Sequence, residues 1–595
     1  MTLPTIPKQL NNAQAILLGG LAAIMLFKMT QGRFVAAMTL SQVATIALAT
    51  SAGYALGWFL SPQARQFRAA VKIGLMLLVT LFCLGNLWFG WTYATIAAWI
   101  GFFWAFGLWF GSAVRGFFTK PTTFGSAEWA TFAHLQENGL IGSSGIRLGG
   151  FAAHDALHPL HYTGDRHLLT IAPTRSGKGT TAIIPNLLTY GDEKSGSVLV
   201  IDPKGENALI TASQRIAMGQ EVHIVDPWNI ASGGRASRFN PLDWLDPADP
   251  DITENAMILA DALVMAEDTA EKFWIEEAKA LLHGLILHVA TCPHEEGHRH
   301  LGRVRDLLLL DGDDMKHLWQ RMLDSEHHLV ASAGARAAQK DEKLLASVIA
   351  SAQAQTHFLD SQKLRHSLAA SDFKFEDMKT KAMSIYLVLP ADRLNAFGRW
   401  LRLLIQQAIT VSARNIATKP EKPILFILDE MPALGRLTMV EQAYALMAGF
   451  SMVIWGIAQD LGQIKKIYGD GGYESLISNS GVIQYYGSRD KITSEYFSSL
   501  CGVTTTWSIS SAIARAVSTT TSSGMNGNSS SSSSTTTTET STATQRNLAY
   551  ADELMRLKPD QQLVFVEACN PIIGIKQPWF ADPELSAKGV NLHRK

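Results

Sequence analysis

The chain has 595 residues and a formal net charge of −1, which together exclude a single compact domain and a general nucleic-acid coat. The charge is unevenly distributed, because residues 1–127 contain eight Lys or Arg and no Asp or Glu, whereas the remainder carries 43 basic and 52 acidic residues. The four cysteines have no paired spacing, which is typical of a reduced cytoplasm. The composition therefore predicts a basic front, residues 1–127, and an acidic body, residues 128–595. It does not exclude a locally basic channel within the body.

The front is predicted to be a membrane anchor over residues 1–115. The 42 uncharged residues 73–114 suffice for two crossings of a hydrocarbon core about 30 Å thick, since a helix rises about 1.5 Å per residue. The 31 uncharged residues 34–64 suffice for one crossing, and the 15-residue run 13–27 is a marginal further candidate. We favour about four transmembrane helices, with three as the alternative, and a cleaved signal peptide is the competing interpretation of the first run.

Basic residues between the spans indicate the orientation of this anchor. Arg65, Arg68 and Lys72 form one short basic loop, and Arg115 and Lys120 follow the last span. The positive-inside rule places both groups in the cytoplasm. The large body of the chain is therefore predicted to be cytoplasmic, in a multi-pass membrane protein.

The stretch HLLTIAPTRSGKGTTAIIPNLLTY (167–190) has the order strand, turn and helix that a phosphate-binding loop needs. In such a loop, backbone N–H groups at the start of the helix form an anion pocket and a lysine reaches the outer phosphates. Gly177 permits close approach of the backbone, and Lys178 supplies the charge. The stretch nevertheless departs twice from G-x-x-x-x-G-K-[ST], since Ala172 replaces the first glycine and Gly179 follows the lysine.

The second departure affects the expected Mg²⁺ ligand. Gly179 has no hydroxyl, so Thr180, Thr181 or a water molecule must take that place, and we favour Thr180. The predicted nucleotide-binding residues are Thr174, Arg175, Ser176, Gly177, Lys178, Gly179 and Thr180.

A second motif strengthens the nucleotide hypothesis. The apolar run 423–428 ends in Asp429 and Glu430, which places two carboxylates at the C-terminal end of a buried strand. Ligands of open parallel sheets gather at that edge. Asp429 is suited to hold Mg²⁺ and Glu430 to polarise the attacking water. The alternative is a strand that simply enters a solvated loop.

Other apolar runs of strand length also end in polar residues, as at 197–206 with Asp202 and 221–228 with Asp226. The run 451–460 ends in Gln459, which is placed to sense a terminal phosphate by hydrogen bonding. These runs predict further parallel strands with their carboxyl ends at the same edge.

The run 481–490 presents Arg489 just beyond another predicted strand. In a ring of subunits, this arginine could reach the phosphates bound by a neighbour and act as a charge-stabilising finger. A surface arginine paired with Asp490 is an equally simple interpretation of the spacing.

These motifs in combination resemble the TraG/TraD family of type IV secretion coupling proteins, which are relatives of the FtsK and HerA DNA pumps. The matching stretches are APTRSGKG (172–179), VLVIDPKGE (198–206), RFNPL (238–242), ILDEMPALG (427–435), IAQD (457–460) and GSRD (487–490). In that family a glycine commonly follows the loop lysine. The resemblance covers most of residues 120–580.

The resemblance implies an α/β fold: a RecA-like P-loop NTPase domain with a mainly parallel sheet, an inserted all-α domain and N-terminal transmembrane helices. It further implies a homo-hexameric motor at the bacterial inner membrane that uses ATP and Mg²⁺. Such a motor delivers single-stranded DNA with its relaxase, or proteins, to inner-membrane components of the secretion system. Family members usually carry two membrane helices, so the four expected here differ from that pattern.

The inserted domain is expected at 253–370, where apolar residues recur at helical spacing between two predicted strands. The division predicted for the chain is an anchor at 1–115, a first nucleotide-binding part at 116–252, the all-α insertion at 253–370 and a second nucleotide-binding part at 371–595. A cluster at Cys292, His294, His298 and His300 lacks a standard zinc spacing, so a polar loop is favoured there.

Residues 518–545 are rich in Ser and Thr and have too little apolar surface to offset their ordering entropy. They are predicted to form a flexible loop before a last pair of strands, whose turn is marked by Asn570 and Pro571.

Two functional hypotheses and one runner-up remain open at this point. The first is an ATP-driven DNA translocase acting as a conjugation coupling protein. The second is a membrane-anchored receptor for protein substrates, in which nucleotide mainly stabilises the oligomer. A chromosome-type DNA pump is the runner-up, because its motor core would look alike. Glu430 and Gln459 favour a hydrolytic site, since a purely structural site needs no water-polarising carboxylate.

Overall fold

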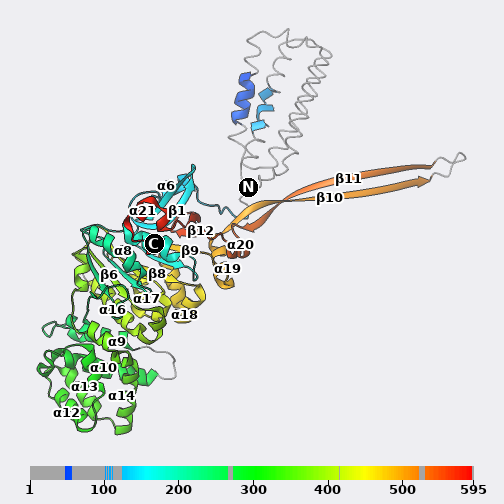
Figure 1. Ribbon diagram of the computed structural model, residues 1–595. Helices are drawn as coiled ribbons and strands as arrows, with labels where there is room; N and C mark the ends of the chain where they lie inside the picture. The colour runs from blue at the N-terminus through cyan, green and yellow to red at the C-terminus, as the bar shows by residue number, and fades with distance from the viewer. Residues whose placement is uncertain are drawn as a thin grey trace. The chain divides into compact units, whose positions relative to one another are not determined.

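The computed structural model describes residues 47–56, most of 101–111, 124–264, 272–414, 416–521 and 529–592, of which 507–521 and 529–543 are described by their backbone alone. These residues form two compact units (Figure 1). One comprises the described residues of 1–127 and 503–547, and the other comprises the described residues of 128–502 and 548–595. Most of the predicted membrane spans lie outside the described residues.

The larger unit is built on one sheet of eleven strands among the described residues, in the order β2-β1-β13-β12-β9-β3-β8-β7-β4-β6-β5. The strands from β9 to β5 in this order are mutually parallel, which confirms the predicted α/β fold with a mainly parallel sheet. They are β3 (His167–Ile171), β4 (Val198–Asp202), β5 (Glu221–Val225), β6 (Met383–Val388), β7 (Ile424–Leu428), β8 (Met452–Ala458) and β9 (Ser480–Tyr485).

An antiparallel extension continues the sheet on the side of β9. It consists of β1 (Ile146–Ala153), β2 (Ala156–Tyr162), β12 (Gln561–Val566) and β13 (Ile572–Ile575). The connection between β12 and β13, 567–571, includes the predicted turn residues Asn570 and Pro571, but its tight turn is Val566–Cys569. β13 also pairs with β1 through Ile575 and Gly150, so residues from both ends of the unit lie side by side.

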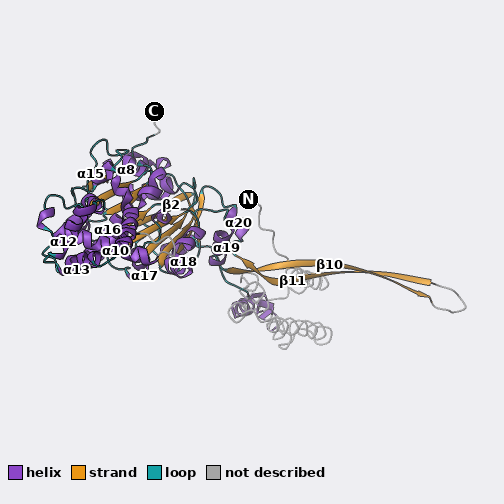
Figure 2. Ribbon diagram, turned by 90° about the horizontal axis from the view of Figure 1, so that it is seen from below, coloured by secondary structure: helices purple, strands orange, loops and turns teal. Residues whose placement is uncertain are grey.

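Alternate residues of each central strand serve two separate cores. In β7, Phe426 and Leu428 belong to one apolar cluster, and Leu425 and Ile427 belong to the other. The second cluster includes residues of α7 (Ile184–Thr189) and α8 (Glu206–Ala217), whereas the first includes residues of α16 (Leu394–Arg414), α17 (Thr438–Leu446) and α18 (Leu461–Ser478). Helices flank the sheet on both sides (Figure 2). Because both faces of the sheet are covered, the sequences of the central strands are continuous apolar runs.

The helices inserted between β5 and β6 gather at one end of the larger unit (Figure 1). They are α9 (Ile252–Leu263), α10 (Lys272–Thr291), α11 (Leu301–Leu308), α12 (Gly312–Leu323), α13 (His328–Ala338), α14 (Glu342–Thr356) and α15 (Gln362–Ser367). α9 packs against α16 on one side and against α10 on the other, so it forms the base of the insertion. The remaining helices are α6 (Phe132–Glu137), α19 (Lys491–Leu500), α20 (Ala551–Met555) and α21 (Pro583–Lys588).

The Ser/Thr-rich segment differs from the flexible loop expected at 518–545. In the structure, β10 (Val503–Thr521) and β11 (Ser529–Asn547) pair along their whole length as an antiparallel ribbon. Threonine is β-branched and favours extended backbone, and the inter-strand hydrogen bonds satisfy the polar main chain without a large apolar core. The prediction weighed only the missing apolar surface and therefore missed this ribbon.

Two helical segments of the smaller unit, 47–56 and 101–111, cross at glycines. A Cβ added to Gly53 would lie 2.1 Å from the carbonyl oxygen of Trp104, and one added to Gly107 would lie 2.1 Å from that of Thr50. The two backbones therefore approach more closely than any larger residue would allow. Within the described residues, no helix is both long enough and apolar enough to span a bilayer.

Candidate functional site

The loop between β3 and the following helix has the backbone shape of an anion-binding turn. Arg175 and Gly177 both adopt left-handed conformations, with φ of 62° and 89°. A Cβ on Gly177 would meet only ordinary contacts, the nearest at 3.6 Å, so its φ rather than a lack of space favours glycine there. The helix begins with a π-helical turn, Gly179–Ile183, a form that is frequent at functional sites. The first N–H groups of a helix have no partner within it, so this loop can receive an anion.

Four of the predicted site residues meet beside this loop. The Nζ atom of Lys178 lies 2.7 Å from Oδ1 of Asp429 and 2.6 Å from Oε1 of Glu430. The Nε2 atom of Gln459 donates to Oε2 of Glu430 at 3.1 Å. These residues come from three segments that adjoin the neighbouring parallel strands β3, β7 and β8. The structure thus places the loop lysine, both carboxylates and the glutamine at the carboxyl edge of the sheet, where ligands of such folds bind.

Glu430 is held in a strained conformation. Its φ of 58° and ψ of 44° lie in the left-handed region, which non-glycine residues seldom adopt. Such strain persists when the surrounding structure fixes it, and it gathers at active sites. Here the following turn, Met431–Leu434, is held by a buried arginine, because the guanidinium of Arg402 donates to the carbonyl oxygens of Leu434 and Arg436, both at 2.8 Å.

Arg402 also donates to the carbonyl oxygen of Ala262 at 3.3 Å. Ala262 lies near the end of α9, the first helix of the insertion. Arg402 is only 4% exposed and its charge is surrounded by carbonyl groups, so burial lowers its pKa to about 10. Sequence reasoning missed this residue because it lies within a long amphipathic helix that carries no motif.

The site brings one ammonium group together with two carboxyl groups. Burial alone would lower the pKa of Lys178, but the adjacent carboxylates of Asp429 and Glu430 outweigh it and raise that pKa. Burial raises the pKa of Asp429, and the charge of Glu430 adds to this. Two carboxylates therefore share one ammonium group, a set of charges that favours a divalent ion with oxygen ligands.

The two threonines after Gly179 differ in their surroundings. Thr181 is buried, and its hydroxyl donates to the carbonyl oxygen of Gly177 at 2.9 Å and contacts the hydroxyl of Tyr486 at 3.3 Å. Thr180 is half-buried, and its hydroxyl donates to the same carbonyl at 3.1 Å. Thr180 is thus the more accessible of the two hydroxyls, and it keeps lone pairs for a metal ion.

Several predicted residues lie away from this cluster. Arg489 is exposed and has no ion-pair partner among the described residues, whereas Asp490 caps α19 by accepting from the N–H of Thr493 at 2.8 Å. Among the described residues, no ion pair joins Arg489 to Asp490. Asp226, at the end of the edge strand β5, accepts instead from the N–H groups of Ala231 and Ser232.

Asp202 ends β4, the strand beside β7, and is 1% exposed. Its Oδ2 atom accepts from the N–H of Ala208 at 2.9 Å. Burial raises its pKa to about 6, and the charge of Asp429 adds to the shift. Asp202 is therefore close enough to Asp429 for the two charges to affect each other.

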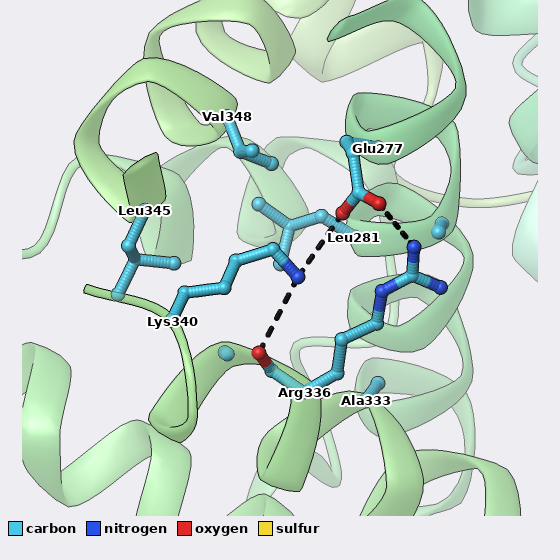
Figure 3. A pocket seen from close by; sticks show the side chains of 9 residues that line it. Glu277, Leu281, Ala333, Arg336, Lys340, Leu345 and Val348 are labelled. Carbon is cyan, nitrogen blue, oxygen red and sulfur yellow. Dashed lines mark hydrogen bonds and ion pairs between the residues drawn. The ribbon is translucent and has the colours of Figure 1, made fainter. Parts of the chain in front are cut away.

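A separate hollow lies in the helical insertion, between α10, α13 and α14 (Figure 3). Glu277 forms ion pairs there with Arg336 and, at 3.1 Å, with Lys340. Burial would raise the pKa of Glu277, but these two cations hold it below its ordinary value. Because Arg336 and Lys340 are both paired with Glu277, this hollow offers no unpaired cation to a phosphate among the described residues.

The sequence model of the family described as "Type IV secretory system Conjugative DNA transfer" matches residues 128–594. The match spans well over half of the chain and includes every residue of the cluster described above. The chain belongs to this family. The predicted resemblance to coupling proteins is thereby confirmed.

Curated relatives of the chain carry the names VirD4 and TraG. Protein VirD4 of Rhizobium radiobacter is 29% identical over 404 residues, covering 66% of this chain and 57% of that protein. Conjugal transfer protein TraG of Escherichia coli is 28% identical over 513 residues, covering 78% of each. The chain thus spans little more than half the length of VirD4.

The chain shares its fold with solved structures of the plasmid coupling protein TrwB. TrwB in complex with the non-hydrolysable ATP analogue ADPNP superposes with a TM-score of 0.54 at 14% identity, covering 76% of this chain and 93% of that one. TrwB in complex with ADP and Mg²⁺ gives the same TM-score. At this identity the likeness shows a common fold.

Proposed function

We propose that this protein is the ATP-driven coupling protein of a type IV secretion or conjugation system. The observation that carries the proposal is the contact of Lys178 with Asp429 and Glu430, and of Glu430 with Gln459, at the carboxyl edge of a parallel sheet. Membership of the conjugative DNA transfer family supports the choice of this motor over others.

The loop and its lysine bind the phosphates of ATP. Nucleotide binding draws Lys178 from the two carboxylates to the outer phosphates, which frees Glu430 to accept a proton from the attacking water. Gln459, already bonded to Glu430, orients that water or the terminal phosphate. The TrwB complexes with ADPNP and with ADP and Mg²⁺ support the choice of ligands.

Asp429 and Thr180 are the residues that would hold Mg²⁺. A carboxylate and a hydroxyl are oxygen ligands of the type this ion prefers, and the uncompensated carboxylate charge of the cluster favours a cation. When bound, Mg²⁺ would supply charge neutralisation at the outer phosphates.

The N-terminal part anchors the motor in the bacterial inner membrane as a multi-pass domain, with the large body in the cytoplasm. The close crossing of Gly53 and Gly107 supports this proposal, because small residues at helix crossings are common in membrane proteins. Inner-membrane components of the secretion system are the expected neighbours of this part.

The cargo proposed is single-stranded DNA with an attached relaxase, or a protein substrate. The proposal is tested by measuring ATP hydrolysis of the full-length protein in lipid nanodiscs with and without single-stranded DNA. We expect DNA to stimulate hydrolysis severalfold. Hydrolysis that occurs but does not respond to DNA would favour a protein cargo, and binding without any hydrolysis would favour the receptor hypothesis.

The active form is proposed to be a homo-hexamer in which Arg489 contacts the phosphates held by the neighbouring subunit. The exposure of Arg489 and its lack of an ion-pair partner in the described part of its own chain support this role. Subunits carrying Arg489→Ala and subunits carrying Glu430→Gln should each be inactive alone. Mixtures should regain part of the activity, because some interfaces then combine an intact Arg489 with an intact Glu430. No recovery at any mixing ratio would exclude an action between subunits.

A further inference from the structure

A buried lysine lies behind the phosphate-binding loop, at a position that no motif identifies. Lys576 directly follows β13, and its backbone N–H donates to the carbonyl oxygen of Asp560 at 2.7 Å. Its side chain is only 5% exposed. The Nζ atom lies 3.3 Å from the carbonyl oxygen of Ser176 and 3.4 Å from that of Tyr486.

The charge of Lys576 has no carboxylate within ion-pair distance in the described part of the chain. Its ammonium group lies 4.8 Å from the ring centroid of Tyr486, over the face of the ring. Burial lowers its pKa to about 8, and the more distant Asp560 opposes this only in part. A buried ammonium held by two carbonyl oxygens and a ring is poorly compensated, because removal of an ion from water is costly.

The surroundings of Lys576 indicate what compensates this charge. Ser176 is the residue before Gly177 in the phosphate-binding loop, so the ammonium lies directly behind the expected anion pocket. Tyr486 follows β9, contacts Thr181 through its hydroxyl, and stands three residues before Arg489. Lys576, at the end of the β12–β13 hairpin, therefore contacts both the phosphate-binding loop and the residue that follows β9.

We propose that Lys576 is a second positive charge of the nucleotide site, which strengthens phosphate binding from behind the loop by holding the Ser176 carbonyl and by its electrostatic field. It is a positioning residue that does not touch the nucleotide. This inference rests on the proposed nucleotide-binding function. The ligand that it serves is the phosphate chain of a nucleoside diphosphate or triphosphate.

The test compares Lys576→Met, which removes the charge at similar volume, with Lys576→Arg, which retains it. In the full-length protein, Lys576→Met should weaken binding of a fluorescent ATP analogue about tenfold, the effect of one charge acting over several ångströms at intermediate dielectric. Lys576→Arg should recover most of that affinity. We expect KM to rise in Lys576→Met while kcat stays within about twofold, because the lost interaction acts on binding.

A merely structural role is distinguished by thermal unfolding. Replacement of a buried, unpaired charge by an apolar side chain should leave the melting temperature without nucleotide unchanged or raised. The increase in melting temperature that saturating ATP causes should shrink, because that increase follows the affinity. A lower melting temperature without nucleotide, combined with no recovery of affinity in Lys576→Arg, would overturn the inference.

Lys379→Met is the matched control. Lys379 is also 5% exposed and burial also lowers its pKa, but it ends the turn Phe375–Lys379 next to the start of β4, at the opposite edge of the sheet. Its nucleotide affinity should equal that of the wild type. If Lys576→Met does not fold, Lys576→Gln replaces it in the same measurements.

The outcomes for Lys576 and for the site itself are separable. Wild-type affinity in Lys576→Met, together with lost affinity in Lys178→Ala, overturns this inference and leaves the proposed function standing. A wild-type protein that binds no nucleotide overturns both.

Discussion

Replacement of Glu430 by glutamine should lower the turnover of ATP by about a thousandfold while nucleotide affinity stays within a few-fold of the wild type. The magnitude is that of a lost general base, which typically contributes 10²–10⁴-fold. Glutamine keeps the shape of the side chain and can still contact Lys178 and Gln459, but it cannot accept the proton of the attacking water. Steady-state hydrolysis and titration with a fluorescent ATP analogue measure the two quantities.

Glu441→Gln is the control for this result. Glu441 lies on α17, its side chain is 22% exposed against 25% for Glu430, and it pairs with Arg436 outside the cluster. Its turnover should remain near the wild-type value. Turnover of Glu430→Gln above about a tenth of the wild type would remove Glu430 from the role of base, since that lies below the usual contribution of such a group.

Replacement of Lys178 by alanine should weaken nucleotide binding by about a hundredfold or more, because truncation of one partner of a buried charge pair typically costs 2–5 kcal/mol. The loss has two parts. The ammonium no longer meets the phosphates, and Asp429 and Glu430 are left without their shared cation. Both carboxylates then repel the incoming phosphates. Equilibrium titration with the fluorescent ATP analogue measures the affinity.

Lys340→Ala is the matched control for Lys178→Ala. Its side chain is 13% exposed against 16% for Lys178, and it pairs with a half-buried carboxylate, Glu277, in the helical insertion (Figure 3). This variant should lose stability without losing nucleotide affinity. Equal affinities of wild type and Lys178→Ala would contradict the assignment of residues 172–179 as the phosphate loop.

The central strands could be predicted because each is covered on both faces. Burial on two sides demands an unbroken apolar run, as at 424–428, and the sequence shows such runs directly. The cluster followed from a general property of parallel sheets, that their carboxyl ends share one edge. β6 was not predicted, since its six residues follow a long helical block and short apolar runs do not by themselves distinguish strand from helix.

The antiparallel extension was predicted only in part. Its last hairpin has an apolar pattern and the turn-favouring residues Asn570 and Pro571, whereas β1 and β2 contain glycines, histidines and a proline that suggest no strand. Pairing with β13 places β1 in the sheet, and that contact joins residues more than four hundred positions apart.

By itself, the sequence determined the loop with Lys178, the strand ending in Asp429 and Glu430, and the positions of Gln459 and Arg489, because each belongs to a local pattern with a direct physical meaning. Only the tertiary structure decided that Lys178 lies within bonding distance of both carboxylates. It also showed that the hydroxyl of Thr181 contacts that of Tyr486, and that Asp490 caps α19 while Arg489 is exposed. Arg402 and Lys576 likewise emerged only from the fold. Their partners are backbone carbonyls distant in the chain, and backbone groups leave no trace in a sequence.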